Sequence, residues 1–143
     1  AACDLAVAAD DSRFATSGIN VGLFCSTPSV PVSRNLGRKQ AMELLLTGHF
    51  IDAHTALKWG LVNRVVPASR LDQEVAELAG SIMSKSWVAV ATGKRMFYKQ
   101  LELPLESAYD YASGVMAGNM MADDVEEGVD AFMQKRTPVW KHQ

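Results

Sequence analysis

The sequence predicts an α/β fold, with a few short strands near its start and a run of helices after them. Residues 1–36 are rich in Ala, Val, Ser and Gly, and their short apolar stretches are bounded by turn residues. Residues 37–143 instead repeat apolar side chains mostly at helical spacing. Because 48% of the 143 residues are hydrophobic and 21% are charged, the chain can bury the core of one ordinary domain.

Two strands are expected in the first region. Residues 5–9 (LAVAA) form an apolar run typical of a buried strand, and residues 10–12 (DDS) suit a turn. Residues 13–17 (RFATS) suit a second short strand. These strands lead into a loop that is expected to line a pocket.

Glycine and proline define that loop. Gly18 and Gly22 allow positive φ or a close approach of the backbone to a ligand, although a plain turn is the simpler interpretation for glycines alone. Pro28 and Pro31 disfavour a long helix between residues 23 and 33.

Residues that typically begin or end helices predict six helices in the second region. Gly48 and Gly60 can end helices at a C′ position, and Asp52 can cap the short helix between them. A strand over residues 61–66 ends at Pro67. The expected helices cover residues 38–48, 53–59, about 69–84 and about 88–100, a segment from Pro104, and about 124–135.

Charge and composition exclude several classes of function. A net charge of −2 gives no electrostatic basis for a nucleic-acid partner, and apolar runs of about five residues are too short for a membrane span. Cys3 and Cys25 lack metal or redox spacing and suit free thiols in a reducing compartment. No pair among His49, His54 and His142 has ligand spacing, so no metal site is expected.

One long motif carries a family resemblance. The segment LLLTGHFIDAHTALKWGLVNRVVP, residues 44–67, resembles the pattern L-x-L-T-G-x-x-I-x-A-x-x-A-x-x-x-G-L-V-x-x-V-x-P of the crotonase (enoyl-CoA hydratase/isomerase) superfamily. CDLAVAADDSRF (residues 3–14) and EEGVDAFMQKRTPVW (residues 126–140) are similar to two further segments of that family. The matching positions are Leu44, Leu46, Thr47, Gly48, Ile51, Ala53, Ala56, Gly60, Leu61, Val62, Val65 and Pro67.

The resemblance covers nearly the whole chain and roughly the second half of the family's domain. It implies the C-terminal part of a crotonase-type ββα spiral followed by a helical trimerisation region. Residues 1–36 would hold the last strands of the spiral and the pocket loop, and residues 37–143 the helical C-terminal region. We expect a truncated or processed piece that on its own is marginally stable or aggregates, because residues 5–7 and Phe14 would lack sheet neighbours and present unpaired edges.

The family's chemistry explains which residues matter. Its members bind acyl-CoA thioesters, and two backbone N–H groups stabilise an enolate-like oxyanion. Those donors and one hydratase glutamate are expected upstream of Cys3. A second glutamate follows phenylalanine by four residues in the pattern F-x-x-P-E-x-x-x-G. Here Phe14 and Gly22 keep the frame, and the glutamate position is Gly18. Glycine cannot move a proton, so we assign no catalytic residue and expect no normal hydration.

The resemblance also implies ligand contacts. The pocket loop would bind substrate through Ser17, Gly18, Gly22, Cys25 and Ser26. Cys25 could act as a nucleophile only with a neighbouring base or positive charge, and neither is visible nearby in the sequence, so a buried apolar role is simpler.

Two later residues match family positions that contact coenzyme A. Lys135 would reach the CoA phosphates, and Met116 would pack on the adenine. Their simpler alternatives are a charge that complements the helix dipole for Lys135 and a core position for Met116.

Three functions stay open. The first is an acyl-CoA-binding family member in fatty-acid metabolism without normal hydratase activity, which needs no cofactor beyond the CoA thioester as substrate or ligand. The second is an active hydratase/isomerase-type lyase in the complete protein, and the third is a non-catalytic truncated isoform that acts through oligomerisation. The resemblance further implies a homo-oligomer (a trimer or a dimer of trimers) in the complete protein and a mitochondrial location.

Overall fold

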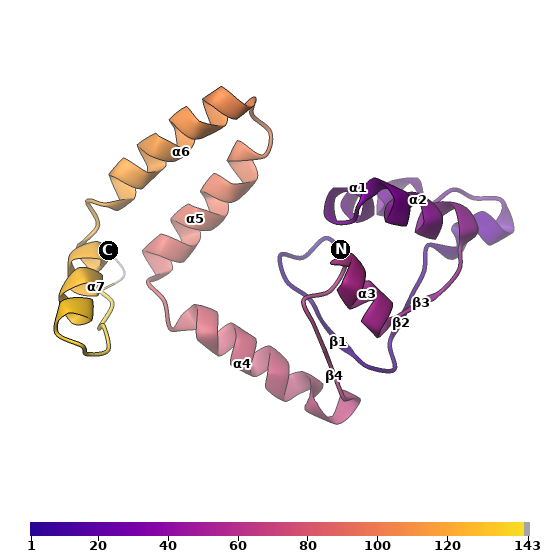
Figure 1. Ribbon diagram of the computed structural model, residues 1–143, viewed down its shortest axis with the longest axis horizontal. Coiled ribbons are helices and arrows are strands. Elements are labelled where there is room, and N and C mark those ends of the chain that lie inside the picture. Colours follow the sequence, from indigo (N-terminus) through magenta and orange to yellow (C-terminus); the bar gives the residue numbers. More distant parts are fainter. Residues whose placement is uncertain (142–143) are drawn as a thin grey trace. The chain divides into compact units, whose positions relative to one another are not determined.

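The structure, a computed structural model, describes residues 1–141 and confirms the predicted α/β class. The chain divides into two compact units, Ala1–Glu77 and Leu78 onward, which are described separately (Figure 1). The expected division after residue 36, between the last strands of the spiral and the helical region, is a different kind of boundary and stays a prediction. No helix in the described part of the chain is long and apolar enough to cross a membrane.

The first unit contains a parallel pair of strands. Strand β1 (Val7–Ala9) runs parallel to β4 (Arg64–Val66), with Val7 opposite Arg64. The amide of Ala6 extends this pairing by donating to Asn63 Oδ1 at 2.8 Å. Both predicted strands therefore form, each shorter than the apolar run that predicted it.

A second, antiparallel pair follows the predicted turn over residues 10–12. Strand β2 (Arg13–Phe14) pairs with β3 (Ile51–Asp52), with Phe14 opposite Ile51. The expectation that the early strands lack sheet neighbours was therefore wrong, because each finds a partner from the motif segment. Each sheet has only two strands among the described residues, so every strand keeps one open edge.

The prediction against a long helix near the prolines was also wrong. Helix α1 (Ser26–Asn35) has Pro28 in its first turn, where an N–H would have no partner in the helix. Pro31 lies inside α1, and its missing N–H leaves the Thr27 carbonyl without its helical donor. Burial of Val32 inside α1 and of Leu36 at its end offsets that loss.

Helix α2 (Arg38–Thr47) supports the loop that precedes α1. It ends as predicted at Gly48, whose φ of +62° places it in the left-handed region. Residues Ser17–Val21 form a short 3-10 helix, η1, rather than the end of a strand. The buried Thr16 hydroxyl donates to the Leu44 carbonyl at 2.8 Å, which ties the start of η1 to α2.

Helix α3 (Ala53–Trp59) closes the first core. Asp52 caps it by accepting from the Thr55 amide at 2.7 Å, as predicted, and that bond lowers the pKa of Asp52. Ala53 and Ala56 are fully buried against β1 and the segment before β4. A second cluster, formed by Val32, Leu36, Ala41 and Leu44, lies between α1 and α2.

Helices make up the second unit. A short 3-10 helix, η2 (Ala68–Arg70), leads into α4 (Leu71–Met83), which crosses the boundary between the units. Helices α5 (Trp87–Gln100) and α6 (Leu105–Asn119) pack along each other, and α7 (Asp123–Met133) follows a short connection (Figure 1). Ser86 caps α5 through the Ala89 amide, and Pro104 precedes α6 as predicted.

Candidate functional site

The predicted pocket loop is built from η1 and the start of α1. Ser17 begins η1, and Gly22 ends it with a φ of +80°, a conformation that glycine adopts without strain. Cys25 precedes α1, and Ser26 is its first residue. The loop turns back on itself through a bond of 3.0 Å from the Leu23 amide to the Gly18 carbonyl, which brings Gly18 next to Cys25.

The loop leaves no room for a side chain at position 18. A Cβ built on Gly18 would lie 2.7 Å from the Leu23 carbonyl oxygen and 2.8 Å from Cys25 Sγ. Both distances are shorter than the van der Waals contact of a carbon atom with an oxygen or a sulfur atom. The half-buried Cys25 thiol and the Leu23 backbone therefore occupy the space in which a residue-18 side chain would begin.

Apolar side chains project from the same loop. Val21 is 83% exposed and Leu23 is 67% exposed, and Phe24 is also exposed. These three apolar side chains fall within four consecutive positions of the loop. The loop can thus offer an apolar wall together with the exposed Ser17 and Ser26 hydroxyls.

Lys135 lies where α7 ends. Its φ is +54°, and no other non-glycine residue in the described part of the chain has a positive φ. The Lys135 amide donates to the Phe132 carbonyl at 3.2 Å, and the Arg136 amide donates to the Ala131 carbonyl at 3.0 Å. These two bonds form a Schellman motif, in which glycine usually takes the position of Lys135.

The three cations at the end of the chain differ in their partners. Arg136 forms a two-pronged ion pair with Glu127, with Nη2 at 2.8 Å from Oε2. Lys141 Nζ lies 3.8 Å from an Asp123 carboxylate oxygen. The exposed Lys135 ammonium has no carboxylate partner among residues 1–141, so it is the cation of this segment that is available to an anionic ligand.

Glu127 organises the segment after α7. Besides the Arg136 guanidinium, its carboxylate accepts from the Val139 amide at 2.7 Å. The Arg136 hydrogen bonds, followed by the Val139 N–H, lower the pKa of Glu127 to about 2. Glu127 therefore stays ionised at every physiological pH.

This shift predicts an acid-dependent stability difference. Because folding lowers the pKa of Glu127 from 4.5 to about 2, its contribution is complete above pH 4.5 and is lost as the pH falls towards 2. We expect wild type to melt above Glu127→Gln at pH 7, with the gap closing between pH 4.5 and 2. Thermal melts across this range measure the gap, and Glu126→Gln, at an exposed position, is the control. A gap that persists at pH 2 would contradict the assignment.

Met116 lies on α6 with 62% of its surface exposed. Among the described residues it belongs to neither buried apolar cluster, so the alternative of a core methionine is not supported. Its thioether can meet an apolar or planar ligand surface. The predicted packing on adenine stays a prediction.

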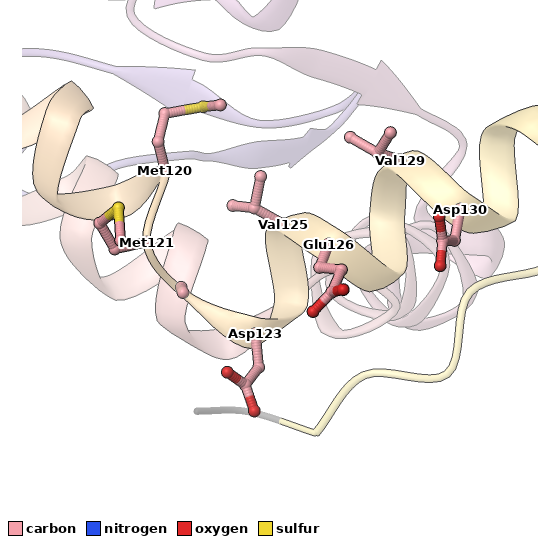
Figure 2. Close-up of a pocket in the computed structure, with 8 residues that line it drawn as sticks. Met120, Met121, Asp123, Val125, Glu126, Val129 and Asp130 are labelled. Atoms are coloured by element: carbon pink, nitrogen blue, oxygen red, sulfur yellow. The ribbon is translucent and has the colours of Figure 1, made fainter.

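Two hollows of the second unit lie away from the predicted site residues. One has a volume of about 310 Å³ and lies along α7, with Val125 and Val129 on one edge of the helix and the Asp123 and Glu126 carboxylates on the other (Figure 2). The other, of about 210 Å³, is lined by Trp140, Ala89 and Val125 among others. Neither hollow is lined by Met116 or Lys135.

A buried polar pair at the second hollow was missed by the sequence analysis. The Ser86 hydroxyl donates to Asp124 Oδ2 at 2.5 Å, and the Lys141 amide donates to Asp124 Oδ1 at 2.7 Å. Ser86 and Asp124 are both about 95% buried. From the sequence, the acidic residues indicated only a favourable helix start. The spacing of three between Asp124 and Glu127 was the available signal that both lie on one face of α7.

The remaining candidates form no cluster. Cys3 is exposed and Cys25 half-buried, and both are free thiols. Within the described residues no three His, Cys, Asp or Glu side chains lie close enough to hold a metal ion. His142 lies outside the described residues.

Comparisons with known proteins agree on one family. The profile described as "Enoyl-CoA hydratase/isomerase" matches residues 1–143. Enoyl-CoA hydratase domain-containing protein 3, mitochondrial, of Rattus norvegicus is 51% identical over 99% of this chain and 47% of its own length. The crystal structure of an enoyl-CoA hydratase from Mycobacterium smegmatis is 56% identical with a TM-score of 0.93, over 96% of this chain and 54% of that one. Human enoyl coenzyme A hydratase domain-containing protein 3 superposes with a TM-score of 0.92 at 50% identity, over 96% of this chain and 55% of that one. The chain spans about half the length of the curated relatives it matches.

Proposed function

Because the chain belongs to the enoyl-CoA hydratase/isomerase family, we propose that it binds acyl-CoA thioesters without normal hydratase activity. Its fold is part of the crotonase-type architecture found in the solved relatives. The family membership supports the ligand class, and the proposed absence of hydration rests on the residue at position 18 and its surroundings.

That feature is the closed loop at Gly18. In the family pattern a glutamate at this position exchanges a proton with the substrate, and glycine cannot do so. A Cβ at this position would approach its neighbours to 2.7 and 2.8 Å, which argues further that the loop conformation excludes any side chain there. The proposed loss of hydratase activity therefore involves the shape of the loop as well as the missing carboxylate.

Lys135 and Met116 are the proposed coenzyme A contacts. The support for Lys135 is its exposed ammonium, which faces no carboxylate among residues 1–141, in a segment where Arg136 and Lys141 already do. An ammonium is a flexible point charge that suits phosphate oxygens. The support for Met116 is its exposure on α6.

The first test is a calorimetric titration of this chain with a short trans-2-enoyl-CoA, while product is followed in the same cell. Saturable binding without product is the expected result. Absence of binding by a folded chain would overturn acyl-CoA binding and favour a role in assembly. Formation of the 3-hydroxyacyl product would overturn the proposed lack of hydration, and any other product would favour a different lyase or isomerase chemistry.

The sharpest single substitution is Lys135→Gly. Glycine removes the ammonium but keeps the left-handed turn without strain, so we expect acyl-CoA affinity to fall about tenfold, the effect of losing one charge-assisted contact. Stability should rise by about 1 kcal/mol, because the side chain no longer opposes positive φ. Calorimetry measures the affinity and urea unfolding measures the stability. Lys99→Gln, which removes an exposed ammonium on α5, is the control. Unchanged affinity in Lys135→Gly would contradict the proposed phosphate contact.

We further propose a homo-oligomer, a trimer or a dimer of trimers, in the complete protein, and a mitochondrial location. Exposed apolar side chains at the end of the second unit support the first proposal, since Met121, Phe132 and Met133 are each at least 74% exposed. The names of the close relatives support the second. A strictly monomeric species in analytical ultracentrifugation of the complete protein, or its absence from isolated mitochondria, would count against the corresponding proposal.

A further inference from the structure

We infer that Glu127 is a positioning residue for Lys135, and that its ion pair with Arg136 holds the turn that presents the Lys135 ammonium to an anionic ligand. The inference rests on the proposed contact between Lys135 and the CoA phosphates. It adds a carboxylate that touches no ligand and acts through the neighbouring backbone.

Lys135 adopts a backbone conformation that residues with a side chain rarely take. A left-handed conformation costs an ordinary residue roughly 1–2 kcal/mol, so a lysine stays there only when its surroundings hold it. Helix α7 contributes the two hydrogen bonds of the Schellman motif. Those bonds set the turn but leave the direction of the chain after Arg136 undetermined.

Glu127 fixes the direction of the chain after Arg136. Its carboxylate binds the Arg136 guanidinium on one side of the turn and accepts from the Val139 amide three residues later. Gln134 Oε1 accepts from Arg136 Nε at 2.7 Å, which holds the guanidinium from the other side. Lys135 therefore lies between Gln134 and Arg136, whose side chains are held by these hydrogen bonds.

The same carboxylate engages the charge next to Lys135. Arginine can bind a phosphate through two donors at once, but Arg136 directs Nη1 and Nη2 at Glu127. Lys135 faces no carboxylate among residues 1–141. Glu127 therefore fixes the chain on the C-terminal side of Lys135 and occupies the neighbouring guanidinium, which leaves the Lys135 ammonium to meet the ligand.

A double-mutant cycle tests the inference. The dissociation constant of a short acyl-CoA is measured for wild type, Glu127→Gln, Lys135→Gly and the double variant, with thermal melts to establish folding. We expect Glu127→Gln to weaken binding about threefold to tenfold in the wild-type background and to have no further effect when Lys135 is already glycine. Arg136→Gln breaks the same ion pair without freeing a guanidinium that could take the place of Lys135, and it should weaken binding to the same extent. Glu126→Gln makes the same change of charge one residue away and should leave binding unchanged.

The outcomes separate this inference from the proposed function. If wild type does not bind acyl-CoA, or if Lys135→Gly binds as well as wild type, the proposed contact fails and this inference fails with it. If Lys135→Gly loses affinity but Glu127→Gln and Arg136→Gln keep it, only the inference is overturned. An equal loss from Glu127→Gln in both backgrounds would also overturn it, because the carboxylate would then act independently of Lys135.

Discussion

Replacement of Gly18 by glutamate is expected to destabilise the protein without producing hydration of enoyl-CoA. The new Cβ would meet the Leu23 carbonyl oxygen and Cys25 Sγ at less than 3 Å, so the loop must shift before any carboxylate can reach a substrate. Overpacking of this kind typically costs roughly 1–3 kcal/mol. Urea unfolding and an assay that follows the loss of the enoyl thioester measure the two effects.

Two further variants separate the volume of that side chain from its charge. Gly18→Ala introduces the same Cβ without a carboxylate and should lose most of the same stability. Gly114→Glu adds the same carboxylate at an exposed position of α6 where a Cβ has no neighbour within 4 Å, so stability should stay equal or rise slightly. Hydration by Gly18→Glu with wild-type stability would show that the loop can accept the missing acid/base group.

Substitution of Asp124 by alanine is expected to give the largest loss of stability in the second unit. It removes the acceptor for the buried Ser86 hydroxyl and for the Lys141 amide, both bonded to the carboxylate at 2.5–2.7 Å. Loss of such charge-assisted bonds with burial of the unpaired donors costs roughly 2–4 kcal/mol. Urea unfolding of the variant and wild type measures the difference.

The neighbouring carboxylate provides the control for this experiment. Asp123 has half of its side chain exposed and lies 3.8 Å from the Lys141 ammonium, so Asp123→Ala should change stability by about 0.5 kcal/mol or less. Asp124→Asn keeps an acceptor oxygen, so its loss of stability should lie between those of Asp123→Ala and Asp124→Ala. Equal losses from Asp123→Ala and Asp124→Ala would mean that helix-start charge, rather than the buried bonds, accounts for the role of Asp124.

Local signals predicted the helix boundaries well. Gly48 and Gly60 both end helices in the left-handed conformation, and Asp52 caps α3 through Thr55. These features depend on contacts within a few residues, which are visible in the sequence. Helix α1 was missed because it depends on burial of Val32 and Leu36, which is a tertiary effect that the local preferences of Pro28 and Pro31 conceal.

The site was predictable only where a family pattern or local chemistry identified a residue. The motif frame identified position 18, and glycine there already excluded proton transfer. Sequence could not reveal that Cys25 and Leu23 fill the adjoining space, since that depends on how the chain turns between them. The partner choices of Glu127 and Asp124 were equally hidden, because each binds a segment at least nine residues further along the chain.

The parallel pairing of β1 with β4 has a consequence for how the chain is made. Ala6 and Asn63 are 57 residues apart, and closing a loop of that length costs roughly 3–4 kcal/mol in chain entropy. β1 therefore cannot pair with β4 until Val66 has left the exit tunnel, and long-range pairings of this kind form slowly. During synthesis residues 5–9 thus wait for their β4 neighbour, so the parallel pair is expected to form late in the folding of the first unit.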